Sequence, residues 1–478
     1  MGDMRTVDLD DGAPDDAAPA PVQQRRRRWP WLLAAVVLVV GALATWQRVI
    51  DAREHRALAE AADASGVLLP LPEQLRDLWS VPTDLGFGGQ VAAVGPHLLA
   101  ASTSDDGTGY EIHEVDRLTG ATGWSVTGSV ATAGAGGVDC RPLSPDSAPP
   151  TLAACAIGIP LVYGVLPTET SAARLVVLDA ATGDVLSTTE TSGSAWTTSG
   201  DQLVTAVPQN DGDGVTWTLT AVDGPTGAPA WTLTLPTVPV APPETDENGL
   251  ATGRMTMSSL AGSPGRVVLA DQGHAWVVVD GRLQTSETVP ADWSVSLDAS
   301  GVVEIAPGDG TSSGQMRLVL TDGSTTEAPV QQISVAVDDG SMPGLVLVRA
   351  WKGLALQARD ATTGAVRWEV PAGGTQVLVM AGRVITRSGD DIAAVDADDG
   401  HVVWHTHTVT DSAIQLLTDA HNVYVPVPGR LRAFALSDGT ELPDRVLPQE
   451  HADETPFNLA GVLALYGTGA GQSVAVVG

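Results

Sequence analysis

Between residues 78 and 478 the chain alternates short apolar runs, rich in Val, Ala and Leu, with polar segments rich in Gly, Asp and Thr. Short apolar runs bounded by turn residues are typical of β-strands. The stretch Gln376-Val-Leu-Val-Met-Ala-Gly-Arg-Val-Ile-Thr386, for example, predicts two strands around a tight turn. This pattern predicts an all-β domain over residues 78–478.

One motif recurs at the turns: Asp, two variable residues, Thr, Gly, and in most copies a Trp shortly after the Gly. The Asp carboxylate and Thr hydroxyl are expected to accept hydrogen bonds from turn amides, and the Gly to supply a positive φ. The Trp is expected to anchor one sheet on the next. The turn residues are Asp116, Gly120, Asp179, Gly183, Asp223, Gly227, Asp360, Gly364, Asp396 and Gly400, and the Trp residues are Trp124, Trp231, Trp368 and Trp404.

The spacing of these turns indicates a β-propeller of four-stranded blades. A sixth turn lies at Gly439, and two eroded copies lie at Asp280-Gly281 and Asp322-Gly323. Residues 457–478 predict three strands of a last blade, and Leu78-Trp-Ser-Val81 predicts its fourth. We expect eight blades, with seven or nine as alternatives, because propellers usually have about four to eight blades.

A different pattern precedes the repeats. Residues 1–28 are acidic and Pro/Ala-rich and end in four arginines, which predicts a disordered cytoplasmic tail. Residues 29–46 are uncharged and apolar with Trp at both ends, which predicts a transmembrane helix; a cleavable signal peptide is the alternative. Residues 47–77 are expected to form a stalk. We therefore predict a single-pass plasma-membrane protein with residues 78–478 extracytoplasmic.

Charge and cysteine content narrow the classes of partner and compartment. The net charge of −32 excludes nucleic acid as a partner, because phosphates would be repelled. Cys140 and Cys155 are the two cysteines and are expected to form a disulfide outside the cytoplasm; two free buried thiols are the alternative.

Three features of the sequence are candidates for a catalytic or metal-binding site. Gly310-Thr-Ser312-Ser-Gly314 matches a nucleophile-elbow string, but its polar context predicts a flexible turn. His401, His405 and His407 are spaced to share one strand face, where an exposed surface is the simpler interpretation than a metal site. The paired aspartates beside the turns do not follow calcium-loop spacing. We assign no catalytic residue and no metal ligand.

The repeats resemble the PQQ-like β-propeller family, whose units run strand, Ala-x-Asp-x-x-Thr-Gly, strand, Trp. Within it the chain is similar to the BamB-like envelope proteins, which are not enzymes. This resemblance implies an eight-bladed ring in which Trp124, Trp231, Trp368 and Trp404 dock on neighbouring blades. Quinoprotein alcohol dehydrogenases share the repeat, bind PQQ with calcium, and use a disulfide between adjacent cysteines; this chain has no adjacent pair.

The function expected from the sequence is a membrane-anchored scaffold that binds proteins or ligands at the cell envelope. Envelope or membrane proteins are the expected partners, and no cofactor is expected. Loops on a rigid ring are suited to such binding. The alternative is a PQQ-dependent dehydrogenase-like enzyme that binds PQQ with calcium.

Overall fold

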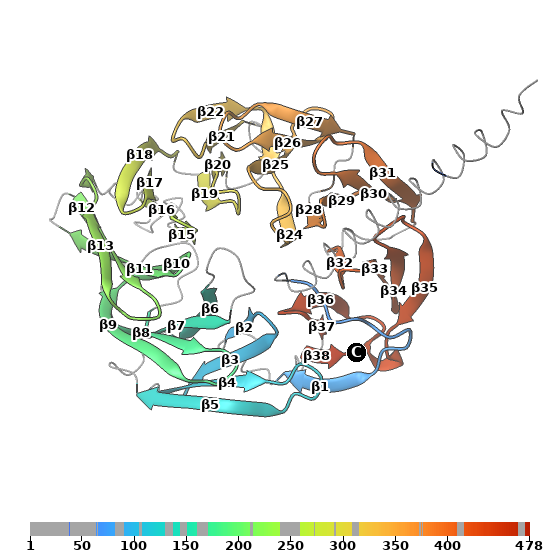
Figure 1. Cartoon of the computed structure of the whole chain (residues 1–478), viewed down its shortest axis with the longest axis horizontal. Coiled ribbons are helices and arrows are strands. Elements are labelled where there is room, and N and C mark those ends of the chain that lie inside the picture. Colours follow the sequence, from blue (N-terminus) through green and yellow to red (C-terminus); the bar gives the residue numbers. More distant parts are fainter. Residues whose placement is uncertain are drawn as a thin grey trace, which may run out of the picture. The chain divides into compact units, whose positions relative to one another are not determined.

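The turn motifs and apolar runs form strands throughout the part of the chain that the structure, a computed structural model, describes. The described residues are 38, 64, 66–81, 90–104, 108–129, 137–143, 151–159, 171–210, 214–239, 259–271, 273–290, 293–307, 315–371, 374, 376–408, 415–466 and 474–478. They contain nine sheets, which we number as blades 1 to 9 in chain order; all strand pairs are antiparallel except one in blade 7. The blades are arranged around a ring (Figure 1).

The first four blades follow the simple order of a four-stranded meander. Blade 1 contains β2 (Gln90–Val94), β3 (His97–Thr103), β4 (Gly109–Val115) and β5 (Thr122–Ser129). Blade 2 contains β6 (Val138–Leu143), β7 (Leu152–Ile157), β8 (Ser171–Asp179) and β9 (Val185–Gly193). Blade 3 contains β10 (Ala195–Ser199), β11 (Gln202–Asn210), β12 (Gly214–Asp223) and β13 (Pro229–Thr234), with β14 (Val238–Pro239) beside β12. Blade 4 contains β15 (Ser259–Ser263), β16 (Arg266–Asp271), β17 (His274–Val279) and β18 (Arg282–Thr288).

The remaining blades include two irregularities, a parallel strand and a composite sheet. Blade 5 contains β19 (Trp293–Leu297), β20 (Val303–Pro307), β21 (Met316–Val319) and β22 (Thr325–Ala328). Blade 6 contains β23 (Val330–Gln332), β25 (Leu345–Ala350), β26 (Leu356–Asp360) and β27 (Val366–Val370). Blade 7 contains β28 (Gln376–Met380), β29 (Arg383–Ser388), β30 (Asp391–Asp396) and β31 (Val402–His407), with β24 (Ser334–Asp338) parallel to β28. Blade 8 contains β32 (Leu417–Thr418), β33 (Asn422–Val427), β34 (Arg430–Ala435) and β35 (Glu441–Val446), followed by the 3-10 helix η1 (Gln449–His451). Blade 9 contains β36 (Thr455–Leu459), β37 (Val462–Tyr466), β38 (Val474–Val477) and β1 (Asp77–Val81).

The blade number corrects the expectation of eight. Both eroded turns close complete blades, because Asp280-Gly281 joins β17 to β18 and Asp322-Gly323 joins β21 to β22. Asp280 and Gly281 both adopt positive φ, 47° and 73°, which suits a two-residue hairpin turn. A blade therefore does not require the longer Asp-x-x-Thr-Gly turn, and the described residues form nine blades, the larger of the two alternatives.

The ring closes by the pairing predicted from the sequence. β1 pairs antiparallel with β38, with Trp79 opposite Val476 and Val81 opposite Val474. This pairing completes blade 9 from both ends of the repeat region and leaves no interrupted sheet at the joint. The predicted composite blade is confirmed.

A strap of residues 67–76 crosses the joint between blades 8 and 9. Its backbone amides at Leu68 and Leu69 donate to Thr418 of blade 8 and Gly461 of blade 9. Leu68, Leu71 and Leu75 are buried in one apolar cluster with residues of both blades. Residues 67–76 fall in the predicted stalk, and the structure makes them part of the propeller instead.

Apolar clusters between neighbouring blades form the core. Trp217 of blade 3 and Trp276 of blade 4 share one such cluster and are each 1% exposed. Full burial of side chains this large stabilises the ring, since each removes well over 100 Å² from water. The seams between blades are therefore the places where the fold gains most of its stability.

The predicted membrane helix at residues 29–46 lies outside the described residues, apart from Leu38, which is helical and exposed. The described part of the chain contains no helix that is long and apolar enough to cross a membrane. This finding contradicts the predicted single-pass plasma-membrane location.

The predicted disulfide is confirmed. Cys140 of β6 and Cys155 of β7 lie directly opposite each other, are bonded, and are both buried in the core between blades 1 and 2. Their sequence separation is 15 residues.

Replacing both cysteines by serine should lower the free energy of unfolding by about 3 kcal/mol, because the bond restricts the unfolded chain. Urea denaturation of the full chain with and without reductant checks this prediction. Reductant should destabilise the natural chain to a similar extent and leave the double variant unchanged. An equal effect of reductant on both would contradict it.

Candidate functional site

The Asp-x-x-Thr-Gly turns lie on the ring face that also carries the turn between the first two strands of each blade. In the first copy the Asp116 carboxylate accepts hydrogen bonds from the Thr119 amide and hydroxyl, both at 2.8 Å, and from the Leu118 amide at 3.1 Å. These bonds, led by the Thr119 hydroxyl, lower the pKa of Asp116. The carboxylates of Asp179, Asp223 and Asp360 accept the corresponding amide and hydroxyl bonds from their own turn residues.

Asp396 is the variant copy, because Asp399 occupies the Thr position. The Asp396 carboxylate accepts bonds from the amides of Asp398 and Asp399, and Asp399 accepts from His401. The five turn glycines predicted to need positive φ have φ between 66° and 78°. They are Gly120, Gly183, Gly227, Gly364 and Gly400.

At most of the seams that carry a Trp, the indole packs on the turn glycine of the next blade. A Cβ built on Gly183 would lie 2.6 Å from Cδ2 of Trp124, and one on Gly400 would lie 2.7 Å from Cβ of Trp368. The indole Nε1 also donates to a backbone carbonyl of that turn: Trp124 to Ala180 at 3.0 Å and Trp368 to Ala397 at 2.7 Å. Trp404 and Trp79 make the same two contacts with blades 8 and 1.

The seam between blades 3 and 4 departs from this arrangement. Trp231 covers Gly281, but its Nε1 donates 2.9 Å to the Gln202 side chain of its own blade. The neighbouring turn is the shortened Asp280-Gly281, which lacks the long arch whose carbonyl accepts the indole bond elsewhere. At this seam the shorter turn leaves space between the two blades.

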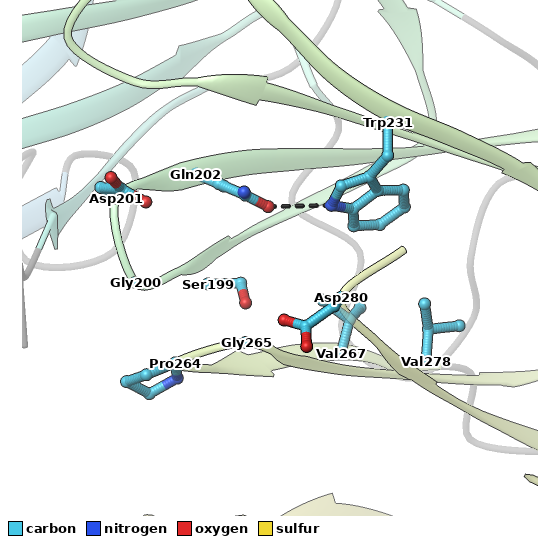
Figure 2. Close-up of a pocket in the computed structure, with 10 residues that line it drawn as sticks. All are labelled: Ser199, Gly200, Asp201, Gln202, Trp231, Pro264, Gly265, Val267, Val278 and Asp280. Atoms are coloured by element: carbon cyan, nitrogen blue, oxygen red, sulfur yellow. Dashed lines mark hydrogen bonds between the residues drawn. The ribbon is translucent and has the colours of Figure 1, made fainter. Parts of the chain in front are cut away.

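That space is a pocket of about 360 Å³ between blades 3 and 4. Two hairpin tips, at Ser199–Gln202 and at Pro264–Gly265, form its sides, and Trp231 and Asp280 lie across from each other (Figure 2). Ser199 is buried and donates 2.7 Å to the Ser263 carbonyl of the other hairpin, which ties the two sides together. Figure 2 shows the Asp280 carboxylate turned toward the middle of the lining residues. We take this pocket, the seam pocket, as the candidate functional site.

A second pocket of about 530 Å³ lies at the seam between blades 9 and 1. Strap residues such as Leu69 and Leu71 give it a mainly apolar lining. The Arg117 guanidinium donates 2.7 Å to the Gly95 carbonyl and lies close to Gly461 of blade 9. Arg117 therefore fills part of this seam with a cation that the chain itself supplies.

The three histidines do not come together. His405 and His407 lie on exposed β31 and both approach the Asp391 carboxylate, at 3.5 and 3.0 Å. His401 instead pairs with Asp399 at 2.7 Å, which raises the pKa of His401. All three histidine side chains are exposed, and each contacts a single carboxylate. The string at residues 310–314 lies outside the described residues.

Glu304 is a titratable group that the sequence analysis missed. It lies on β20 opposite Ser296, is 4% exposed, and accepts a 3.3 Å hydrogen bond from the Ser296 hydroxyl. Burial, and then the nearby Asp298 carboxylate, raise the pKa of Glu304 to about 8. A single Glu in an apolar run is its sequence signal, in Val302-Val-Glu-Ile305.

The disulfide does not fit the feature that the family resemblance attaches to quinone binding. Cys140 and Cys155 join two strands and are 4% and 1% exposed inside the core between blades 1 and 2. They are not adjacent residues that present a disulfide to a cofactor. We therefore derive no chemical step through PQQ.

A family model described as outer membrane protein assembly factor BamB matches residues 298–458, which confirms the predicted resemblance over these residues. The quinohemoprotein alcohol dehydrogenase of Comamonas testosteroni is 12% identical, with a TM-score of 0.37, over 89% of this chain and 84% of that chain. Saccharomyces cerevisiae Sqt1 is 10% identical, with a TM-score of 0.36, over 86% of this chain and 98% of that chain. Likenesses this low do not establish a shared activity, and no curated protein matches the chain.

Proposed function

We propose that this propeller is a non-enzymatic scaffold that binds a partner protein through the turn face, the face of the ring that carries the Asp-x-x-Thr-Gly turns. The observation that carries the proposal is the seam pocket, which opens between two hairpin tips tied together by the Ser199 bond. A rigid ring holds such tips in fixed positions, so little order has to be gained on binding.

The chemistry of the seam pocket supports recognition of a polar, cationic group. Asp201 and Asp280 supply carboxylates and Trp231 supplies an aromatic wall. The Ser199 hydroxyl and the Gln202 oxygen bond to Ser263 and Trp231, and so hold the lining in place. The net charge of −32 would further steer basic partners toward the ring.

The partner class expected from the sequence, envelope or membrane proteins, remains part of this proposal. The family model that matches residues 298–458 is that of outer membrane protein assembly factor BamB, and an assembly role in that family supports this partner class. The absence of a cofactor is likewise part of the proposal.

Crosslinking of the tagged full-length chain in cells, followed by affinity capture and mass spectrometry, tests the scaffold. We expect a partner at near-stoichiometric yield, and the purified partner should bind the purified full-length chain in calorimetry. The purified chain should show no saturable binding of PQQ in the presence of calcium. Saturable PQQ binding without any partner that rebinds would contradict the proposal and favour the dehydrogenase alternative.

A further inference from the structure

The chain shows at two other seams what can occupy the space that is open between blades 3 and 4. The position to compare is the first residue after the tight turn between the first two strands of a blade. It is Arg266 in blade 4, Arg383 in blade 7 and Gln202 in blade 3, each opposite the last residue of the preceding strand.

Both arginines reach across their seam to the outer turn of the next blade. Arg266 donates to the carbonyls of Leu320 and Thr321 at 2.9 and 3.0 Å. Arg383 donates to the carbonyls of Leu436 and Ser437 at 2.9 and 2.8 Å. A guanidinium with its planar fork of donors thus fills the seam and pairs two backbone acceptors at once.

The seam between blades 7 and 8 is the direct counterpart, because it also contains a Trp at the equivalent place. There the Trp404 indole and the Arg383 guanidinium both donate to the Leu436 carbonyl, each at 2.9 Å. In blade 3 the equivalent residue is Gln202, which is shorter than Arg and uncharged, and its oxygen accepts from Trp231. Among the described residues, none places a basic side chain where the guanidinium lies at the other seam.

At this seam carboxylates, which attract a guanidinium more strongly than backbone carbonyls do, lie near the open place. The shortened turn brings the Asp280 carboxylate to within 3.3 Å of a Cβ built on Gly265, at the edge of the pocket. Asp201 stands at the tip of the facing hairpin. The pocket lining, all of it described, contains these two carboxylates and no basic side chain.

We propose that the seam pocket binds an arginine side chain presented by a partner protein, in the place that Arg383 occupies at the seam between blades 7 and 8. The proposal rests on the proposed scaffold function and specifies the chemistry of its partner. A carboxylate and a guanidinium form charge-assisted hydrogen bonds, which are stronger than neutral ones.

Calorimetry on the purified full chain tests this with defined probes: the peptide Gly-Gly-Arg-Gly-Gly, arginine amide, and the same peptide with citrulline. We expect the arginine peptide to bind, arginine amide to bind more weakly, and the neutral citrulline peptide not to bind. Equal affinity for arginine amide and the peptide would overturn the inference that a protein presents the arginine and would indicate a small guanidinium ligand. No binding of the arginine peptide at millimolar concentration would overturn the site.

Two variants locate the binding. Gln202→Arg should abolish peptide binding, because the chain would then fill its own pocket, and Asp280→Asn should weaken it about tenfold. Asp184→Asn, an exposed turn Asp of blade 2, is the matched control for charge and should leave binding unchanged. Asp280 is exposed, so its variant is expected to fold. Equal effects of Asp280→Asn and Asp184→Asn on peptide binding would contradict the pocket. If the captured partner binds the Gln202→Arg variant as well as the natural chain, the arginine site is wrong but the scaffold function is not.

Discussion

Gly183→Ala should lower the free energy of unfolding by about 3 kcal/mol or more, although it adds a single methyl group. Two costs combine: an alanine at φ 75° is strained, and its Cβ would lie 2.6–2.9 Å from three atoms of the Trp124 indole. The indole cannot simply move away, because its Nε1 is held by the Ala180 carbonyl at 3.0 Å. Urea denaturation of the full chain measures the loss.

Gly382→Ala is the matched control for this prediction. Gly382 has φ 71°, nearly the same as Gly183, and a Cβ there would meet nothing within 4 Å. Its substitution should therefore cost only the backbone strain, about 1 kcal/mol. In a Trp124→Ala background, the loss in free energy of unfolding caused by Gly183→Ala should decrease to a similar value, because the clashing indole atoms are absent. Equal costs for Gly183→Ala and Gly382→Ala in the natural background would show that the seam does not depend on this contact.

Glu304→Gln should stabilise the propeller at neutral and alkaline pH and have little effect near pH 4. In the folded chain burial raises the pKa of Glu304 from 4.5 to about 8, so the carboxyl keeps its proton at neutral pH. In the unfolded chain it loses that proton above about pH 4.5. Between these two pH values the unfolded state binds fewer protons, and stability falls as pH rises.

The expected size follows from the pKa difference. At about 1.4 kcal/mol per pH unit, the natural chain loses on the order of 3 kcal/mol from this group between pH 4.5 and 7. Glutamine has the same shape and remains neutral, and it can accept the Ser296 hydrogen bond in the same place. Chemical denaturation at a series of pH values should give a flatter stability profile for Glu304→Gln than for the natural chain.

Glu287→Gln serves as the comparison, because Glu287 is a partly exposed Glu on outer β18, paired with Arg317 at 3.6 Å. It should not reproduce the gain at alkaline pH. Parallel pH profiles for Glu304→Gln and the natural chain would show that Glu304 is ionised in the folded protein, contrary to its position in the core.

The turn chemistry explains why the fold could be predicted from the sequence. The Asp-x-x-Thr-Gly motif satisfies its own amides locally, so each copy forms the same hairpin wherever it occurs. Closure between β1 and β38 followed from counting strands at the two ends of the repeats. The expected number of eight blades is wrong, because it rests on the usual upper limit for propellers, whereas both eroded turns, Asp280-Gly281 and Asp322-Gly323, close complete blades.

The candidate site could not be predicted from the sequence, because it depends on which side chains of two neighbouring blades lie together at their seam. Gln202, Trp231 and Asp280 come from two blades, and only the ring brings them to one pocket. The eroded turn at Asp280-Gly281 was visible as a departure from the repeat, and the departure is where the pocket lies. Glu304 shows the same limit, since burial between neighbouring strands, and not its type, changes its chemistry.

Photocrosslinking from single positions on the full chain tests the central claim, that the turn face binds a partner at the seam between blades 3 and 4. A photoreactive amino acid at position 264, on the exposed tip of the blade 4 hairpin beside the pocket, is compared with one at position 184, on an exposed turn of blade 2. The account predicts a specific crosslinked partner from position 264 and little from position 184. Crosslinks of equal yield from both positions, or no specific product from position 264, would contradict the account, whereas a product from position 264 that survives Gln202→Arg would overturn only the arginine site.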